Sequence, residues 1–339
     1  MKLMKKIAAL GIASVLTMSL ITGCGSKSEE SSEDKVYKIG VTQYVEHDAL
    51  DAAYEGFVDG LEEAGYKDGE NIEIDLQNAQ ADQSNCQTIA SKLVKDDKDL
   101  ILAIATPAAQ AVANETKDIP ILVTAVTDPA DAKLVESNEE PGTNVSGTSD
   151  LTPCKEQMEL LTQLVPDAKK VAMLYCSAEA NSKFQIEMAK EAAKELDLET
   201  VDATVADSNE IEQVVKSLKG KVDAIYSPTD NVIAAGMTTV SMVADEIGIP
   251  VIVGEEGMCS GGGLATYGID YYKLGQQTAE MAVKVLEGED ISKMPIEYQE
   301  NCELIINKDT VEKLKVKVPE DLDKEARYIE TITEAESEE

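Results

Sequence analysis

Short unbroken apolar runs alternate along most of the chain with longer segments whose apolar residues lie three or four positions apart. The clearest run is Leu100 to Ala105, which contains no polar position. It is too short to cross a membrane, and its lack of alternation predicts a strand buried on both faces of a parallel sheet. Directly after it, Thr106 is expected as a helix N-cap and Pro107 as the first helical residue. Free backbone N–H groups therefore gather where this helix begins, at the positive end of its dipole.

The same alternation predicts an α/β protein with two similar halves. In the first half, strands are expected at 36–41, 71–76 and 119–124, and helices at 48–64, 82–94 and 106–116. A turn-rich segment at 141–148 leads to Asp150, where we place a crossing into a second lobe. The pattern then restarts, with strands at 170–175, 198–205, 222–226 and 250–253 and helices ending near residues 196, 218 and 247. We predict two Rossmann-like lobes, each a parallel sheet flanked by helices.

The last part of the chain adds a glycine-rich stretch, a long helix and an acidic tail. Gly261 to Gly268 leads into a strand, but it lacks the lysine of a phosphate loop and the spacing of a dinucleotide fold. No cofactor is therefore expected. An amphipathic helix is predicted at 270–287, a short strand and helix at 296–317, and a frayed acidic tail at 319–339.

Charge and composition exclude several functions. The chain has 30 basic and 65 acidic residues, a net charge of −35, which argues against a nucleic-acid partner. Its one histidine, His47, accompanies no recognisable nucleophile motif, so we do not expect an enzyme or a histidine-based metal site. The one arginine, Arg327, lies in the tail, so neither lobe is expected to offer an arginine for a carboxylate.

The N-terminus predicts an exported lipoprotein. Three lysines precede an apolar run at 7–21, which closes with Ile21-Thr22-Gly23-Cys24. This is similar to a bacterial lipobox, in which the cysteine becomes diacylated, for example with palmitate. We therefore expect a signal peptide at 1–23, a disordered tether at 24–35, and a lipid anchor through Cys24 on the extracytoplasmic face of the membrane.

Five further cysteines follow, without any C-x-x-C spacing: Cys86, Cys154, Cys176, Cys259 and Cys302. One disulfide and buried free thiols are both compatible with this pattern.

Short polar side chains follow the predicted strands in both halves. Gln43, Thr106 and Asp128 do so in the first half. Asn181, Ser182, Asp230 and Asn231 do so in the second half. Each alone is commonly a cap or a turn residue. Because the carboxyl ends of parallel strands share one edge of a sheet, the set predicts two polar rims across one cleft.

The order of these motifs resembles a known family. The segments that carry the resemblance are Gly40-Val41-Thr42-Gln43, Leu50 to Gly56, Asn78-Ala79-Gln80, Thr106 to Gln110, Val126 to Pro129, Glu179 to Ser182, Pro228 to Asn231 and Ala265 to Tyr272. Together they resemble the ABC-transporter substrate-binding lipoproteins whose characterised members take tryptophan, tyrosine or phenylalanine. The resemblance covers roughly residues 36–318, although Cys86, Cys154 and Cys259 beside the motifs depart from the pattern.

This resemblance implies a type I periplasmic-binding-protein fold with three crossings between its lobes. Lobe 1 would take 36–150 plus about 269–293, and lobe 2 would take 151–268 plus about 294–318. It also implies a monomer that closes on a free amino acid, an aromatic one in view of the family, and delivers it to a membrane permease.

For such a ligand, we expect the Thr106 hydroxyl and the N–H groups of Ala108 and Ala109 to hold the carboxylate. Asp128 or Asp230 would meet the ammonium group. Gln43, Asn181, Ser182 and Asn231 would orient the ligand, and Tyr44, Tyr175 or Tyr267 would face its ring.

Other ligands of the same fold stay open at this point, namely a nucleoside, a branched amino acid or a sugar, as does a sensor role. A sugar is disfavoured because the chain has no tryptophan and two phenylalanines to stack on a pyranose ring.

Overall fold

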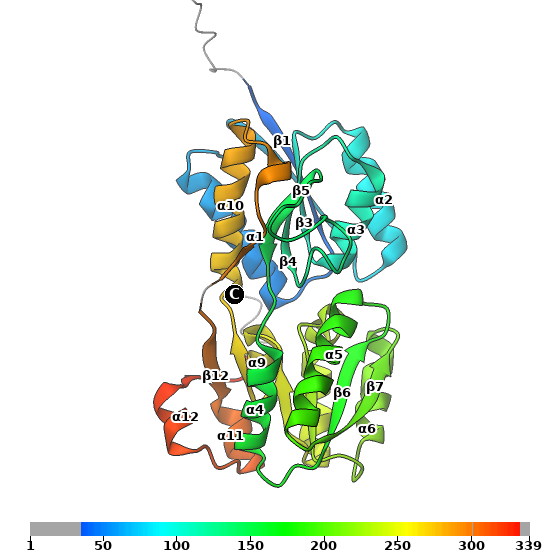
Figure 1. Cartoon of the computed structure of the whole chain (residues 1–339), viewed down its shortest axis with the longest axis vertical. Coiled ribbons are helices and arrows are strands. Elements are labelled where there is room, and N and C mark those ends of the chain that lie inside the picture. The colour runs from blue at the N-terminus through cyan, green and yellow to red at the C-terminus, as the bar shows by residue number, and fades with distance from the viewer. Residues whose placement is uncertain (1–34, 300, 333–339) are drawn as a thin grey trace, which may run out of the picture. The chain divides into compact units, whose positions relative to one another are not determined.

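The computed structural model describes residues 35–299 and 301–332 (Figure 1). Cys24, the predicted signal peptide and the last seven residues of the tail lie outside the described residues. The chain from Val36 onward forms one compact unit. No helix within the described ranges is long and apolar enough to cross a membrane.

A first sheet of six strands runs in the order β11-β5-β4-β3-β1-β2, and all its neighbours pair in parallel. Its strands are β1 (Tyr37–Gln43), β2 (Ile72–Asn78), β3 (Leu100–Ile104), β4 (Ile121–Val126), β5 (Val145–Ser149) and β11 (Glu297–Tyr298). The helices α1 (Asp48–Glu63), α2 (Gln83–Lys95), α3 (Thr106–Glu115) and α10 (Tyr271–Leu286) accompany it. Every residue of β3 and β4 is buried, as expected for central strands covered on both faces.

A second sheet of seven strands runs in the order β13-β12-β10-β9-β8-β6-β7. Its strands are β6 (Lys170–Cys176), β7 (Glu199–Val205), β8 (Ala224–Ser227), β9 (Val251–Val253), β10 (Ala265–Gly268), β12 (Glu303–Asn307) and β13 (Arg327–Ile329). Its helices are α4 (Cys154–Leu164), α5 (Ala180–Glu195), α6 (Ile211–Ser217), α7 (Asn231–Ala235), α8 (Met237–Ile247), α9 (Glu256–Ser260), α11 (Lys308–Leu314) and α12 (Glu320–Glu325). Only the β10–β12 pair is antiparallel among these described strands.

The predicted fold class is confirmed: two mostly parallel sheets are flanked by helices. The chain passes between the sheets after β5, after β10 and after β11. The last passage comes later than the sequence predicts, because Glu297 and Tyr298 still pair with Thr148 and Ser149 of the first sheet. We use lobe 1 and lobe 2 below for the elements around the first and second sheet.

The tail at 319–339 is not frayed over its described part. Leu322 of α12 is buried at 5% exposure, and β13 adds to the second sheet in parallel with β12. The expectation of no arginine in either lobe is therefore wrong as well, since Arg327 begins β13. The many acidic residues of this segment predict a frayed tail, although it contains a buried leucine and a short strand.

Some local predictions also need correction. Thr106 is the first residue of α3 and Ala105 its N-cap, so Thr106 does not cap the helix. The sequence analysis missed α4 and α9, and it placed turns where β5 forms. The five cysteines within the described ranges are free thiols, of which Cys302 alone is exposed.

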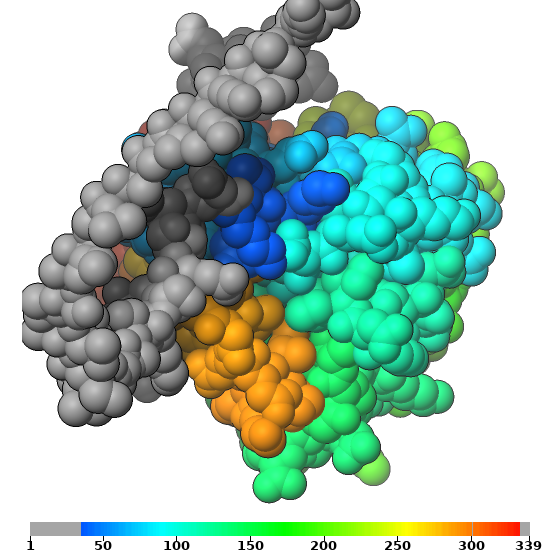
Figure 2. All heavy atoms as spheres, turned by 90° about the horizontal axis from the view of Figure 1, so that it is seen from above, coloured from blue at the N-terminus to red at the C-terminus, as the bar shows by residue number. Residues whose placement is uncertain are grey.

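Helix α10 completes lobe 1 from a distant part of the chain. It crosses α1 closely, because a Cβ atom at Gly56 would overlap the Tyr272 carbonyl and one at Gly275 would overlap the Ala53 carbonyl. Figure 2 shows the orange segment that contains α10 lying directly against the blue and green segments of lobe 1. The first core is thus built from both ends of the chain.

Candidate functional site

The carboxyl ends of the two sheets meet through side chains. Gln185 of α5 donates its Nε2 to Thr229 Oγ1 at 2.7 Å within lobe 2 and to Thr127 Oγ1 of lobe 1 at 3.2 Å. His47 Nε2 of lobe 1 lies 3.5 Å from Asn231 Oδ1 of lobe 2. Helices α3 and α5 also contact each other, and Figure 1 shows α5 directly below α3. The polar rims predicted from the sequence therefore face each other.

On lobe 1, the start of α3 offers polar groups that the protein leaves unused. Thr106 is 2% exposed, and its Oγ1 has no hydrogen-bond partner among the described residues. Ala108 is the third residue of the helix, so its N–H has no carbonyl one turn earlier within the helix. The N–H of Ala109, however, donates to Ala105 O at 3.1 Å, so the predicted free N–H of Ala109 is wrong. An anion site here rests on Thr106 and Ala108.

Gln43 and Tyr44 end β1 with their polar groups occupied. Gln43 Nε2 donates to Val45 O at 3.0 Å and to Asp51 Oδ1 at 2.5 Å, which ties the strand end to α1. The Tyr44 hydroxyl donates to Ala81 O at 3.0 Å. Its side chain lines a pocket of about 520 Å³, whose walls include Ala178 and Val232 from lobe 2. Tyr44 is thus the predicted aromatic residue that the structure places between the lobes.

On lobe 2, Glu179 is the acidic residue that the sequence analysis missed. It precedes α5 and accepts hydrogen bonds from Val232 N at 3.0 Å, from Asn181 Nδ2 at 3.2 Å and from Asn231 Nδ2. Burial raises the pKa of Glu179 well above its ordinary value, and nearby Asp230 raises it further. The signal was present, because Glu179 follows β6 where the other polar residues follow their strands.

Asp230 lies beside Glu179 and is also buried. Its Oδ2 accepts from Ser182 Oγ at 2.7 Å and from Cys176 N at 2.6 Å, while Oδ1 accepts from Ile233 N at 2.9 Å. Burial raises the pKa of Asp230. Burial also raises the pKa of Tyr44 across the cleft, and Glu179 adds to that rise. Among the described residues, no lysine or arginine forms an ion pair with either carboxylate.

The two asparagines line the same edge of lobe 2. The Nδ2 of Asn181 donates to Glu179 and to Thr229 O, whereas its Oδ1 is buried without a partner in the described part of the chain. Asn231 connects Glu179 to His47. Burial lowers the pKa of His47 to about 4, so this ring is neutral above that pH.

The other predicted residues lie elsewhere. Asp128 is half-buried, and its Oδ1 accepts from Asp131 N at 2.9 Å and from Asn138 Nδ2 at 3.3 Å, which is the arrangement of a turn. Tyr267 packs against the core cluster of α4, and Glu325, Glu156 and Glu159 lie near its hydroxyl. The side chain of Tyr175 lies near Asp202 and Lys190. Neither Tyr267 nor Tyr175 is therefore placed with the other candidates.

Comparison with known proteins identifies the family. The family model described as ABC transporter substrate binding protein matches residues 38–329. The chain belongs to this family. It is 48% identical over 318 residues to a protein of Clostridioides difficile (strain R20291) named tyrosine-binding protein, covering 91% of this chain and 92% of the relative.

Two solved structures, one with a ligand and one without, are similar to this chain over most of its length. A Streptococcus pneumoniae domain in complex with L-Trp is 40% identical, covers 87% of this chain and 99% of that chain, and superposes with a TM-score of 0.84. A ligand-free, open substrate-binding protein with adhesive properties from Clostridium difficile is 49% identical, covers 88% and 100%, and gives a TM-score of 0.67. The chain superposes better on the L-Trp-bound relative than on the ligand-free, open one, although its sequence is more similar to the latter.

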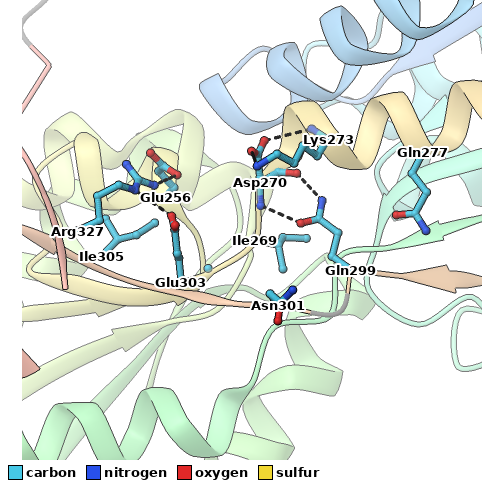
Figure 3. Close-up of a pocket in the computed structure, with 11 residues that line it drawn as sticks. Glu256, Ile269, Asp270, Lys273, Gln277, Gln299, Asn301, Glu303, Ile305 and Arg327 are labelled. Atoms are coloured by element: carbon cyan, nitrogen blue, oxygen red, sulfur yellow. Dashed lines mark hydrogen bonds and ion pairs between the residues drawn. The ribbon is translucent and has the colours of Figure 1, made fainter. Parts of the chain in front are cut away.

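A second pocket of this substrate-binding protein, of about 300 Å³, lies at the passages between the lobes (Figure 3). Gln299 accepts from Asp270 N at 3.1 Å and donates to Asp270 O at 2.5 Å, which ties two passages together. Arg327 pairs with Glu256 at 2.6 Å and with Glu303 at 2.9 Å. Because these charged side chains pair with one another, we interpret this pocket as a structural contact between the passages and not as a ligand site.

Substrate-binding proteins of ABC importers act on the extracytoplasmic side of the membrane, and their task is capture. The cleft of this one provides hydrogen-bond donors on lobe 1 and buried carboxylates on lobe 2. No group of three or more histidine, cysteine, aspartate or glutamate side chains among the described residues could hold a metal ion. The arrangement suits a small ligand that carries both an acceptor end and a cationic end.

Proposed function

We propose that this substrate-binding protein captures a free aromatic amino acid, with tyrosine and tryptophan as the first candidates. One observation carries the proposal. Two relatives that are 40% and 48% identical over most of the chain are described with L-Trp and as tyrosine-binding, respectively. Tryptophan and tyrosine differ in their rings and share their ammonium and carboxylate groups. Site features common to the two relatives should therefore recognise those charged groups.

The ligand carboxylate would lie at the start of α3. The Thr106 hydroxyl and the Ala108 N–H are both without an acceptor among the described residues. The positive end of the helix dipole favours an anion there, and the small side chain of Ala108 leaves room for one.

The ligand ring would lie toward Tyr44, in the pocket that this residue shares with Ala178 and Val232. Tyr44, Ala81, Ala178 and Val232 offer apolar surface to a planar ring there, while Asn78, Asp82 and Asn209 make part of the same lining polar. Gln43, Asn181, Ser182 and Asn231 would hold the surrounding groups in place, because each already bonds to a neighbour at the cleft.

The protein would work as a monomer attached to the outer face of the membrane through acyl chains on Cys24. Closure on the ligand would create the surface that a permease recognises.

The experiment is titration calorimetry of the mature protein with each of the common amino acids, checked by thermal unfolding. We expect tyrosine, tryptophan or phenylalanine to bind, and a ligand at 100 times its Kd should add about 2.7 kcal/mol to stability. Binding of a nucleoside, a sugar or a branched amino acid, with no response to any aromatic amino acid, would overturn the proposal.

A further inference from the structure

Asp150 is a buried carboxylate with one oxygen bonded and the other free. It follows β5 at the first passage between the lobes and is 5% exposed. Its Oδ2 accepts from the Tyr271 hydroxyl at 2.8 Å. Its Oδ1 is buried and has no hydrogen bond of ordinary geometry from any described residue. A buried carboxylate oxygen in this state costs free energy, because it has lost its water without gaining a donor.

Asp150 lies where the chain first passes between the lobes, directly after β5. Tyr271, which holds its other oxygen, begins α10 directly after the second passage between the lobes. The Thr127 hydroxyl also lies near the carboxylate, and this same hydroxyl accepts the hydrogen bond from Gln185 of lobe 2. Asp150 is thus next to the point where α5 of lobe 2 touches lobe 1.

The other acidic candidates at the cleft are already occupied. Both oxygens of Asp230 accept from donors of lobe 2, and so do both oxygens of Glu179. Asp128 is half-buried and serves a turn. Among the described residues, Asp150 is the carboxylate that keeps a buried oxygen without a partner.

Burial raises the pKa of Asp150 to about 6, while Tyr271 and Thr127 offset part of that rise. No described lysine or arginine forms an ion pair with it. A cation placed against Oδ1 would restore the missing partner and favour the ionised form.

We propose that Asp150, rather than Asp128 or Asp230, meets the ammonium group of the ligand and so selects for a free amino acid. This assignment rests on the proposed function, and it places the two charged ends of the ligand at two sites on lobe 1, the start of α3 and the end of β5.

The test compares an aromatic amino acid with its 2-hydroxy analogue, in which a neutral hydroxyl replaces the ammonium group. The wild-type protein, Asp150→Asn and Asp230→Asn are titrated with both ligands by calorimetry. Wild type should prefer the amino acid by about 30-fold or more, the scale expected for a desolvated charge pair. In Asp150→Asn this ratio should fall toward one, whereas Asp230→Asn should weaken both ligands alike and keep the ratio.

Each outcome bears on one proposal. A preserved ratio in Asp150→Asn, or a ratio lost in Asp230→Asn alone, overturns the assignment of Asp150 while amino-acid binding stands. A wild-type protein that binds neither ligand overturns the proposed function first, and this assignment with it. Asp150→Ser provides a second variant, and the circular-dichroism spectrum of each variant verifies folding before the ratio is interpreted.

Discussion

Five buried polar atoms of single residues lack hydrogen-bond partners within the described part of the chain: Thr42 Oγ1, Thr106 Oγ1, Asp150 Oδ1, Asn181 Oδ1 and Ser227 Oγ. Four belong to residues at or just beyond strand ends, and Asn181 lies in the first turn of α5. Each such atom costs about 1–3 kcal/mol of desolvation free energy. Their concentration at the edges where the sheets meet is therefore a mark of binding, because the free energy is recovered when a ligand supplies the missing groups.

Thr106→Val tests this view, because valine keeps the shape and removes the hydroxyl. Stability of the ligand-free protein should stay unchanged or rise by up to about 1 kcal/mol, since no internal hydrogen bond is lost. Affinity for the amino acid should fall by about 1.5–3 kcal/mol, the value of a hydrogen bond to a charged group. Urea unfolding and calorimetry measure the two effects.

The matched control is Thr124→Val, since the Thr124 hydroxyl is also buried but accepts from Thr148 Oγ1 at 3.1 Å. This control should lose stability and keep its affinity. If Thr106→Val destabilised the ligand-free protein as much as the control and bound ligand normally, the Thr106 hydroxyl would have a structural role.

At the scale of elements, the α1–α10 crossing is the contact that tolerates least change. Gly56 and Gly275 let the two helix backbones approach each other, and α10 also lies on the first sheet through β4 and β5. Helix interiors normally disfavour glycine by about 1 kcal/mol relative to alanine. The close packing of two helices outweighs that preference here.

Gly275→Ala should therefore destabilise the protein by about 1–3 kcal/mol or more, although alanine is the better helix former. Gly60→Ala provides a graded comparison on the same interface, because its added Cβ would lie 2.7 Å from the Ala279 Cβ, a smaller overlap than the 2.0 Å from the Ala53 carbonyl at Gly275. Urea unfolding of both variants measures the order. Equal stability of Gly275→Ala and wild type would contradict the close approach.

The sequence predicts elements well where apolar runs are long. The strand at 100–105 and the helix after it appear as β3 and α3 within one residue. By contrast, β5 was missed because Val145-Ser-Gly-Thr-Ser has hardly any apolar signal. Its Gly147 adopts φ +142° against the backbone of Val123, so sheet pairing and a special backbone conformation make the strand.

The sequence predicts where the candidate site lies better than it predicts the role of each residue in that site. Polar residues after strands identified Thr106, Ser182, Asn181 and Asp230. Sequence position says nothing of which carboxylate oxygens are already bonded. Glu179 and Asp150 therefore needed the three-dimensional hydrogen-bond pattern before they could be recognised.

At the scale of the whole molecule, the contact between the lobes buries acidic groups. Glu255 of lobe 2 precedes α9, where its carboxylate accepts from Met258 N at 2.7 Å, and Asp48 of lobe 1 lies close by. Burial, and to a smaller extent the negative charge of Asp48, raise the pKa of Glu255 to about 8 from 4.5.

The stability of the ligand-free protein should therefore fall as the pH rises from about 6.5 to 8. In that range, folded Glu255 and folded Glu179 each bind more protons than they do in the unfolded chain. The free energy of unfolding therefore falls with rising pH by up to about 1.4 kcal/mol per pH unit for each group. His47 adds nothing there, because its lowered pKa removes stability only below pH 6.5. Urea unfolding at several pH values measures the slope.

Glu255→Gln should reduce this slope and leave the part that Glu179 contributes. Glu195→Gln, which changes an exposed carboxylate paired with Lys155, should leave the slope unchanged. The same slope in all three proteins would mean that Glu255 is ionised in the folded state at pH 7.

The interleaving of the two lobes along the chain has a consequence for biosynthesis. The first lobe is incomplete without α10 and β11, which follow the strands β6 to β10 of the second sheet along the chain. A nascent chain that ends before Tyr271 leaves the apolar face of α1 uncovered, whatever its local helix propensity. Neither half of a gene divided at Asp150 would encode a self-sufficient domain. The ribosome must pass Leu286 before the first half of this protein can finish folding.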